Sequence, residues 1–294
     1  MVELDRLRVF QAVAETHSFT RAADRLHLTQ PGISKHIKQM EEYFGVPLFD
    51  RLGRKIALTQ AGEILLETTQ EVMALVVAAE HRIEDLSGMR AGKLTLGSSF
   101  PVGVYTLPRV LAAFREKHPQ IDVTLEIAVS ATIEAAVLAN RLELGLVSSE
   151  VHDSRLVADR FMTDELVVIV PKDHRWTRRG RIGARDLLTE TFIVAAQGAG
   201  ARRVVESRLA AKGIVLENVI DFVNVEGVKH AVEAGLGVSI QPRKVVKREV
   251  EAGVISAHRL ADLDSQISYF SIYRKGRHVS KAGQAFLELL ERKA

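Results

Sequence analysis

Small and apolar residues fall at helical spacing in two neighbouring stretches near the start of the chain. The first stretch places on one helical face Ala22, Ala23 and Leu26. The second repeats apolar residues at i, i+4 and i+7, namely Ile33, Ile37 and Met40. Both spacings are typical of an amphipathic helix with one buried face, and alanines let a second helix cross closely. Residues 19–38 therefore predict two short helices around a tight turn.

The other face of the second helix carries side chains that suit DNA. Its members are Gln30, Ser34, Lys35 and Lys38. Gln can pair with an adenine edge, Lys with guanine or phosphate, and Ser with either. Thr29 is expected to cap this helix and Pro31 to occupy its first turn, so that the partly positive helix end faces the phosphates. The alternative is an ordinary surface hairpin of helices with scattered lysines.

The following residues predict a basic β-hairpin over residues 50–58, called the wing below. Gly45 ends the preceding helix, and Gly53 stands in a basic turn between two short apolar runs, as in a hairpin. Three basic side chains of the wing would hold a DNA backbone or minor groove, Arg51, Arg54 and Lys55. Arg21 on the first helix adds to this patch. Because the net charge is only +3, DNA binding must come from such a local patch.

These motifs together resemble the LysR-type transcriptional regulators. The resemblance rests on residues 18–23, 28–34, 40–41, 48–49 and 58–62, and continues more diffusely through residues 92–97, 107–108, 118–119 and 235–238. It implies a winged helix-turn-helix, a linker helix that dimerises the chain, and an effector-binding region with a solute-binding fold. In that family the full assembly is usually a tetramer made from two dimers.

Residues 59–88 contain no proline and predict one long linker helix. Its apolar seam has at the a positions Thr69, Val76 and Ile83, and at the d positions Leu65, Val72, Ala79 and Leu86. A coiled-coil dimer would follow, with two recognition helices reading two half-sites. The alternative is a helix that packs on its own domain. We expect a DNA-binding domain over 1–58, a linker over 59–91 and an effector-binding domain over 92–294.

Short strands and helices alternate through residues 92–294, which predicts an α/β fold with parallel sheets covered by helices. Strands are expected at 93–97, 123–129, 143–148, 165–171, 192–194, 219–223, 238–240 and 267–273, and helices at 107–117, 132–140, 201–212, 227–234 and 280–292. With the resemblance, this predicts a periplasmic-binding-protein-like domain of two α/β subdomains joined by crossings near 161–165 and 265. Subdomain 1 would span about 92–162 and 266–294, and subdomain 2 about 163–265.

Four loops rich in small polar groups would meet between these subdomains, where ligands bind in such folds. The candidate effector-binding residues are Ser98, Ser99, Phe100, Ser130, Thr132, Ser148, Gln197, Arg202, Asn224 and Glu226. Hydroxyls and free N–H groups at helix starts suit anions, so we expect a small anionic effector, a carboxylate or an inorganic oxyanion. Glu226 opposes this unless it pairs with Arg202 or contacts a ligand amine or hydroxyl. The alternative use of each Ser and Thr is to cap a helix.

Composition narrows the remaining possibilities. The 294 residues are 47% hydrophobic, enough for two or three domains, and contain no cysteine, which excludes disulfides, cysteine metal sites and thiol catalysis. No Gly-x-Ser-x-Gly or His-x-x-x-His motif supports an enzyme. The sequence opens on an acidic amphipathic helix instead of a signal peptide, and no apolar run approaches the ~20 residues of a membrane span. Trp176, alone among the charged residues of 172–181, is expected to be exposed or loosely packed.

The sequence therefore predicts a cytoplasmic LysR-type regulator that binds double-stranded promoter DNA as a homodimer or homotetramer. It would respond to a small effector and contact RNA polymerase, without a membrane, a metal or another cofactor. An enzyme is one alternative. A second is a stand-alone small-molecule-binding protein with an N-terminal dimerisation module, under which the basic wing would have no purpose.

Overall fold

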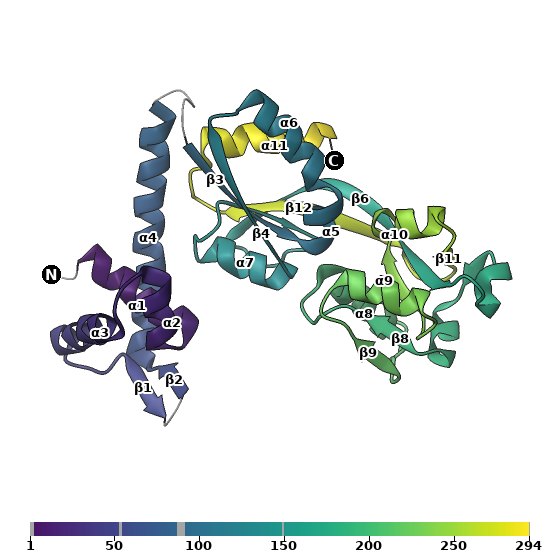
Figure 1. Cartoon of the computed structure of the whole chain (residues 1–294), viewed down its shortest axis with the longest axis horizontal. Coiled ribbons are helices and arrows are strands. Elements are labelled where there is room, and N and C mark those ends of the chain that lie inside the picture. The colour runs from purple at the N-terminus through teal and green to yellow at the C-terminus, as the bar shows by residue number, and fades with distance from the viewer. Residues whose placement is uncertain (1–2, 53–54, 87–91, 149, 294) are drawn as a thin grey trace. The chain divides into compact units, whose positions relative to one another are not determined.

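The computed structural model describes residues 3–52, 55–86, 92–148 and 150–293. They belong to two compact units, Met1–Glu80 and His81–Ala294, called the N-terminal and C-terminal units below (Figure 1). In the described part of the chain, no helix is long and apolar enough to cross a membrane.

The N-terminal unit is built on three short helices, α1 (Leu4–Thr16), α2 (Phe19–Leu26) and α3 (Gln30–Phe44). All six apolar residues that the spacing placed on buried faces of α2 and α3 lie in or against one core around Phe10. The Thr29 side chain accepts a hydrogen bond from the Gly32 N–H at 3.3 Å, so its predicted capping role is confirmed. Gly45 ends α3 with φ +71°, a conformation that glycine adopts without strain.

The predicted wing is a two-stranded antiparallel hairpin of β1 (Phe49–Leu52) and β2 (Lys55–Leu58). After it comes α4 (Gln60–Leu86). Its residue Gly62 lies so near the chain before the wing that an added Cβ would stand 2.1 Å from the Leu48 carbonyl oxygen. The start of α4 and the chain just before the wing therefore approach so closely that only glycine fits at position 62.

The exposed apolar side chains of α4 follow the predicted coiled-coil seam only in part. Leu65, at the first d position, packs against the core of its own unit, as the alternative prediction had it. The most exposed large apolar side chains of the described part of α4 are Ile64, Leu75 and Ile83, at 62%, 72% and 67%. Only Ile83 of these belongs to the predicted seam, and the Leu86 side chain lies outside the description. The exposed stripe is thus shifted by one residue over the first part of the helix.

The C-terminal unit contains a mixed sheet in the order β4-β3-β5-β12-β6-β11-β7, with β10 also paired to β6. The first subdomain contains β3 (Gly92–Ser99), β4 (Ile121–Ala128), β5 (Leu144–Val147) and β12 (Gln266–Arg274), and α5 (Phe100–Tyr105), α6 (Leu107–Lys117), α7 (Ser130–Leu138) and α11 (Lys281–Lys293). Strands β3, β4 and β5 are parallel. Helices α6 and α11 cover one face of this part of the sheet and α7 the other (Figure 1).

The second subdomain contains β7 (Arg181–Ile182), β8 (Phe192–Val194), β9 (Val219–Asp221), β10 (Ser239–Pro242) and β11 (Ile255–Leu260), with α8 (Gly200–Ala210), α9 (Val225–Glu233), α10 (Arg243–Glu251) and the 3-10 helices η1 (Arg175–Arg178) and η2 (Ala184–Thr189). The α/β prediction is confirmed, but the sheet is not purely parallel, because β12, β10 and β11 pair antiparallel to β6. The pattern also missed α5, which is apolar and only six residues long, the amphipathic helix α10, and β11, whose burial does not alternate along the strand.

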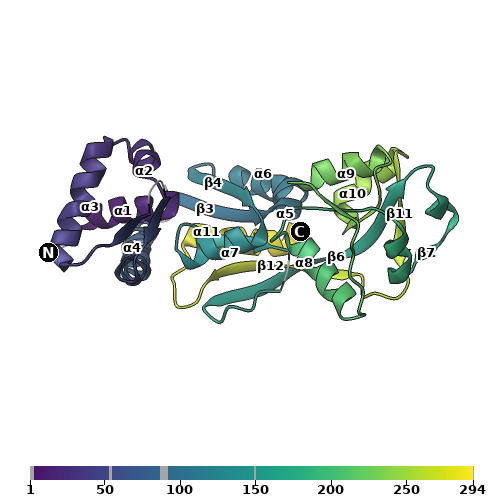
Figure 2. The ribbon, with the colours of Figure 1, turned by 90° about the horizontal axis from the view of Figure 1, so that it is seen from below.

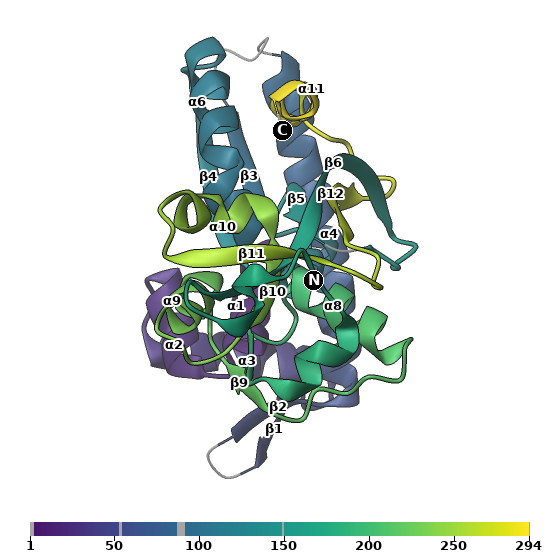
Figure 3. The ribbon, with the colours of Figure 1, turned by 90° about the vertical axis from the view of Figure 1, so that its right-hand side faces the viewer.

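One long strand joins the two subdomains. The predicted crossing near 161–165 and the predicted strand 165–171 are a single 16-residue strand, β6 (Leu156–Pro171). Its first part pairs with β12, and its last residues pair with β10 and β11, so the sheet passes without a break from one subdomain to the other (Figures 2 and 3). The return lies where predicted, since the Leu166 N–H donates to the Ser265 carbonyl at 2.6 Å.

The prediction for Trp176 was wrong. Its side chain is 1% exposed and belongs to the largest hydrophobic core cluster of the C-terminal unit. Helix η1 turns the ring inward, and the His174 ring contacts it edge-on at 4.9 Å between centroids. The charged neighbours of Trp176 project outward from the short 3-10 helix. In the sequence they surround the tryptophan with polar residues, so the pattern gives no sign that its ring is buried.

Candidate DNA-binding surface and effector cavity

Helix α3 presents its predicted DNA-reading side chains to solvent. Gln30, Lys35 and Lys38 are exposed and Ser34 is half-buried, while Ile33 and Ile37 of the same helix are buried. The Gln30 amide donates to the Ser34 hydroxyl at 3.0 Å. Lys38 lies 3.6 Å from Glu42, and Lys35 makes no ion pair with any described residue. An exposed row of polar and cationic groups over a buried apolar face is the arrangement of a DNA-recognition helix.

The other predicted DNA contacts surround this helix only in part. Thr29 and Pro31 are exposed at its N-terminus, and Arg21 is exposed on α2 with its guanidinium bonded to the Thr16 carbonyl. Arg54 lies outside the described residues, and so do the side chains of Arg51 and Lys55. Their roles in the wing stay predictions.

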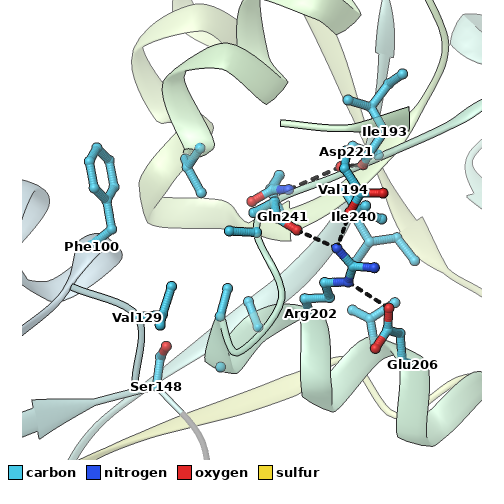
Figure 4. A pocket seen from close by; sticks show the side chains of 18 of the residues that line it. Phe100, Val129, Ser148, Ile193, Val194, Arg202, Glu206, Asp221, Ile240 and Gln241 are labelled. Atoms are coloured by element: carbon cyan, nitrogen blue, oxygen red, sulfur yellow. Dashed lines mark hydrogen bonds and ion pairs between the residues drawn. The ribbon is translucent and has the colours of Figure 1, made fainter. Parts of the chain in front are cut away.

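In the C-terminal unit, a cavity of about 680 Å³ lies between the two subdomains. Its walls come from the ends of β3, β4 and β5 with α5 on one side, and from β8, α8, β9 and β10 on the other. Phe100, Val129 and Ser148 face Arg202 and Gln241 across it (Figure 4). Strand ends and helix starts thus converge as expected for a ligand site in such a fold.

The structure brings together six of the ten predicted effector residues. The walls of the cavity include Ser99, Phe100, Ser130, Ser148, Arg202 and Asn224. The other four are not among the described residues that line it. Ser98 is buried and donates to the Ser99 carbonyl, Thr132 and Gln197 are exposed elsewhere, and Glu226 bonds to other side chains.

Two of the lining hydroxyls are used to hold the first subdomain together. The Ser148 N–H donates to the Ser130 hydroxyl at 3.3 Å, and the two hydroxyl oxygens lie 3.5 Å apart. Gly200, the first residue of α8, lies against Ser148 so closely that an added Cβ would be 2.3 Å from the Ser148 carbonyl oxygen. The subdomains therefore meet at the cavity floor through a backbone contact.

Arg202 is held by acidic neighbours. Its Nε donates to Glu206 at 2.6 Å, and its Nη1 donates to the Ala195 carbonyl at 2.8 Å and to Asp221. Partial desolvation acts to lower the pKa of Arg202, but hydrogen bonds to the two carboxylates raise it overall. With two carboxylates around one guanidinium, this side of the cavity has a net negative charge.

Asn224 and Glu226 both have structural partners at the start of α9. The Asn224 side chain accepts from the Gly227 N–H at 2.9 Å and so caps α9. Glu226 pairs with Lys229 at 3.0 Å and accepts from the Tyr105 hydroxyl, instead of pairing with Arg202. Lys229 is 4% exposed and also pairs with Glu249 at 2.7 Å. This cluster of Tyr105, Glu226, Lys229 and Glu249 joins α5 of the first subdomain to α9 and α10 of the second.

Comparison with known proteins identifies the family. The model of the bacterial regulatory helix-turn-helix protein of the lysR family matches residues 4–63, and that of the LysR substrate binding domain matches residues 87–294. The chain belongs to the LysR family. It is 31% identical to the RuBisCO operon transcriptional regulator of Allochromatium vinosum over 289 residues, which cover 98% of this chain and 95% of that one. It is likewise 31% identical over 291 residues to a probable RuBisCO transcriptional regulator of Cyanophora paradoxa, covering 97% and 90% of the two chains.

Solved structures share the fold of this LysR regulator. A full-length single-residue variant of OxyR from Pseudomonas aeruginosa matches with a TM-score of 0.72 at 22% identity, covering all of this chain and 94% of that one. Full-length CbnR in complex with its target DNA matches with a TM-score of 0.65 at 23% identity and full coverage of both chains. The chain is therefore a LysR-type, DNA-binding transcriptional regulator with an effector-binding domain. It is not an enzyme, and the stand-alone binding protein is not favoured.

Sequence reasoning missed several residues of the regulator's cavity. Asp221 and Glu206 surround Arg202, and Ser239 and Gln241 enter from β10. For Gln241 the sequence offers one indication of a site: a polar residue stands before a proline at the end of a short, mostly apolar run. The others had none, because only the fold brings β9, α8 and β10 next to one another.

Proposed function

We propose that this regulator binds promoter DNA as a homo-oligomer, reading base edges with α3 and holding the backbone with the wing. The observation that supports this most directly is the exposed row of Gln30, Lys35 and Lys38 above a buried apolar face. One such helix reads only a few base pairs, so a dimer or tetramer that places two helices on two half-sites gives the required specificity. The exposed apolar stripe of α4 offers a surface for that pairing.

The effector binds in the cavity between the subdomains and biases the angle between them. That angle sets the spacing of paired DNA-binding domains, and hence DNA bending and contact with RNA polymerase in the cytoplasm. No metal or other cofactor takes part in this proposal. An anionic effector and the boundaries 1–58, 59–91 and 92–294 stay predictions.

Footprinting of the purified full-length protein on its own genomic DNA at moderate salt tests the proposal. We expect a small set of sites with an inverted repeat, and the promoter of a RuBisCO operon is the first to inspect because the relatives are named for it. Binding that is blind to sequence and sensitive only to salt would contradict it, because phosphate contacts alone give that behaviour.

A further inference from the structure

The walls of the cavity in the second subdomain are apolar and form part of the hydrophobic core. They include Phe192, Val194, Val205, Leu209, Ile214 and Ile240, each at most 7% exposed. Protein interiors are close-packed, and an unfilled apolar space destabilises the fold because its lining loses packing partners. A volume of about 680 Å³ lies in the range that holds a drug-sized ligand. An inorganic oxyanion would leave most of these walls facing water or empty space.

Gln241 at the end of β10 lines this cavity, and its side chain carries a buried acceptor that is not used. The Ser239 hydroxyl donates to the Ile193 carbonyl at 2.6 Å, so it accepts from the Gln241 amide nitrogen, which lies 3.0 Å away. This assigns the orientation of the Gln241 amide and leaves its Oε1 without a hydrogen-bond donor in the described structure. The residue is 4% exposed. A buried acceptor without a donor is costly, so a ligand O–H or N–H would be stabilising there.

Ser99 supplies a second unpaired polar atom from the opposite subdomain. It lines the cavity, is 2% exposed, and its hydroxyl has no partner among the described residues. A ligand that meets both Ser99 and Gln241 would contact both subdomains at once. Contacts of that kind are what a ligand needs to favour one angle between them.

The charges around the cavity argue against the anionic effector that was expected from the sequence. Arg202 is the only cationic side chain among the described residues that line the cavity, and it already bonds Glu206, Asp221 and the Ala195 carbonyl. A phosphate would have to displace one of these carboxylates or lie beside them. An uncharged ligand avoids this repulsion.

We propose that the effector is an uncharged, largely apolar molecule that carries a hydroxyl or amide N–H group. Its apolar body occupies the space between α8, β8 and β10, and its donor group bonds the Oε1 of Gln241. This inference rests on the proposed function, because it takes this cavity as the effector site.

Calorimetric titration of the full-length protein with probes of eight carbon atoms tests this ligand class. Octan-1-ol and octanamide are the donor-bearing probes, heptyl methyl ether is the matched probe without a donor, and octanoate and octyl phosphate are the anions. We expect the alcohol and amide to bind at least tenfold more tightly than the ether and the anions. Hexan-1-ol should bind about tenfold more weakly than octan-1-ol, since two fewer methylenes are buried.

Two substitutions assign the binding to the two parts of the cavity. Gln241→Met keeps the size of the side chain but removes the acceptor, so alcohol and ether should bind equally while the dependence on chain length remains. Val205→Phe fills the apolar space and should weaken octan-1-ol at least tenfold, with Ile214→Phe as the second variant if the first does not fold. Val204→Phe is the matched control, because Val204 lies on the same helix but does not line the cavity.

The outcomes separate this inference from the proposed function. Tighter binding of octyl phosphate or octanoate, no binding of any probe, or an alcohol preference that survives Gln241→Met would overturn the inference. If octyl phosphate binds best and changes the DNA footprint, the proposed function stands without the inference. If the alcohol binds as expected but leaves the footprint unchanged, the effector role of the cavity fails while its ligand class is upheld.

Discussion

The recognition surface of α3 and the cavity of the C-terminal unit are built in opposite ways. On α3, the side chains proposed to read DNA come from one stretch of nine residues and point to solvent. Around the cavity, the lining comes from two subdomains and from segments more than a hundred residues apart in sequence. A change on α3 should therefore act at one contact, whereas a change at the cavity can act through the fit between subdomains.

The two sites also differ in whether their positive charge is paired with acidic groups. Lys35 stands exposed without an ion pair to any described residue, ready to meet a phosphate. Arg202 is enclosed by two carboxylates and a backbone carbonyl. One unit keeps its positive charge available for a polyanion, and the other neutralises the charge in its ligand site.

The largest effect is expected for Gly200→Ala, where the subdomains touch. The new Cβ would stand 2.3 Å from the Ser148 carbonyl oxygen, a backbone atom that cannot rotate away. We expect a loss of about 3 kcal/mol in the unfolding free energy of the C-terminal unit, as for severe overpacking. The fluorescence of the single tryptophan, Trp176, during urea unfolding reports this unit alone.

Gly180→Ala is the matched control for this change. A Cβ at Gly180 meets nothing within 4 Å, so its substitution should leave stability within about 0.5 kcal/mol. Equal unfolding midpoints for the two variants would show that the subdomains can separate without cost. The contrast between a local and a distributed site would then lose its basis.

Much of the N-terminal unit could be predicted because its determinants are local. The spacing of Ile33, Ile37 and Met40, the Thr29 cap and Gly45 each act within a few residues, and the structure confirms them. In the C-terminal unit, α6 has the predicted bounds Leu107–Lys117. Trp176 and β6 could not be read correctly, because burial of the ring and continuity of the strand depend on distant partners.

The residues around the cavity also divide into those with a local signal in the sequence and those that depend on distant partners. Ser99 and Phe100 were found because the polar loop that follows a predicted strand carries a local signal. Glu226 does not line the cavity but bonds Tyr105, which lies 121 residues away, and no spacing in the sequence relates the two. Gln241 and Asp221 were missed because their importance comes from what they face across the fold.

Gln30→Ala should have the next largest effect, at a single DNA contact. Its exposed amide can pair bidentately with adenine, a contact worth about 1–3 kcal/mol of discrimination. We expect about 2 kcal/mol less preference for the cognate base at one position of each half-site, measured by binding to a set of single-base operator variants. Gln39→Ala is the control, since Gln39 lies nine residues on and half a turn around the same helix. Unchanged base preference in Gln30→Ala would remove Gln30 from the reading surface.

Lys35→Ala should weaken binding to all sequences alike, by about 1 kcal/mol at moderate salt. If Lys35 meets one phosphate, the slope of log binding constant against log salt falls by about 0.9. Lys247→Ala on α10 is the control, because Lys247 is also an exposed helical lysine, 3.7 Å from Glu251. A slope that stays the same in Lys35→Ala, or falls equally in Lys247→Ala, would mean that the charge on α3 has no special part in DNA binding.

The smallest effect is expected at Tyr105, where a buried polar cluster joins the subdomains. Burial, together with the hydrogen bond to Glu226, raises the pKa of Tyr105 from 10.0 to about 12, against the opposing effect of Lys229. A phenol with a raised pKa in the folded state contributes stability that is complete below pH 10 and is lost as the pH rises toward 12. After solvent screening of this partly exposed ring, we expect a loss of about 0.5 kcal/mol across that window. Trp176 fluorescence in urea should show this alkaline loss in the wild type and a smaller one in Tyr105→Phe. Tyr43→Phe, on an exposed ring of the N-terminal unit, should keep the wild-type pH dependence, and the same dependence in Tyr105→Phe would mean that the cluster does not stabilise the joint between subdomains.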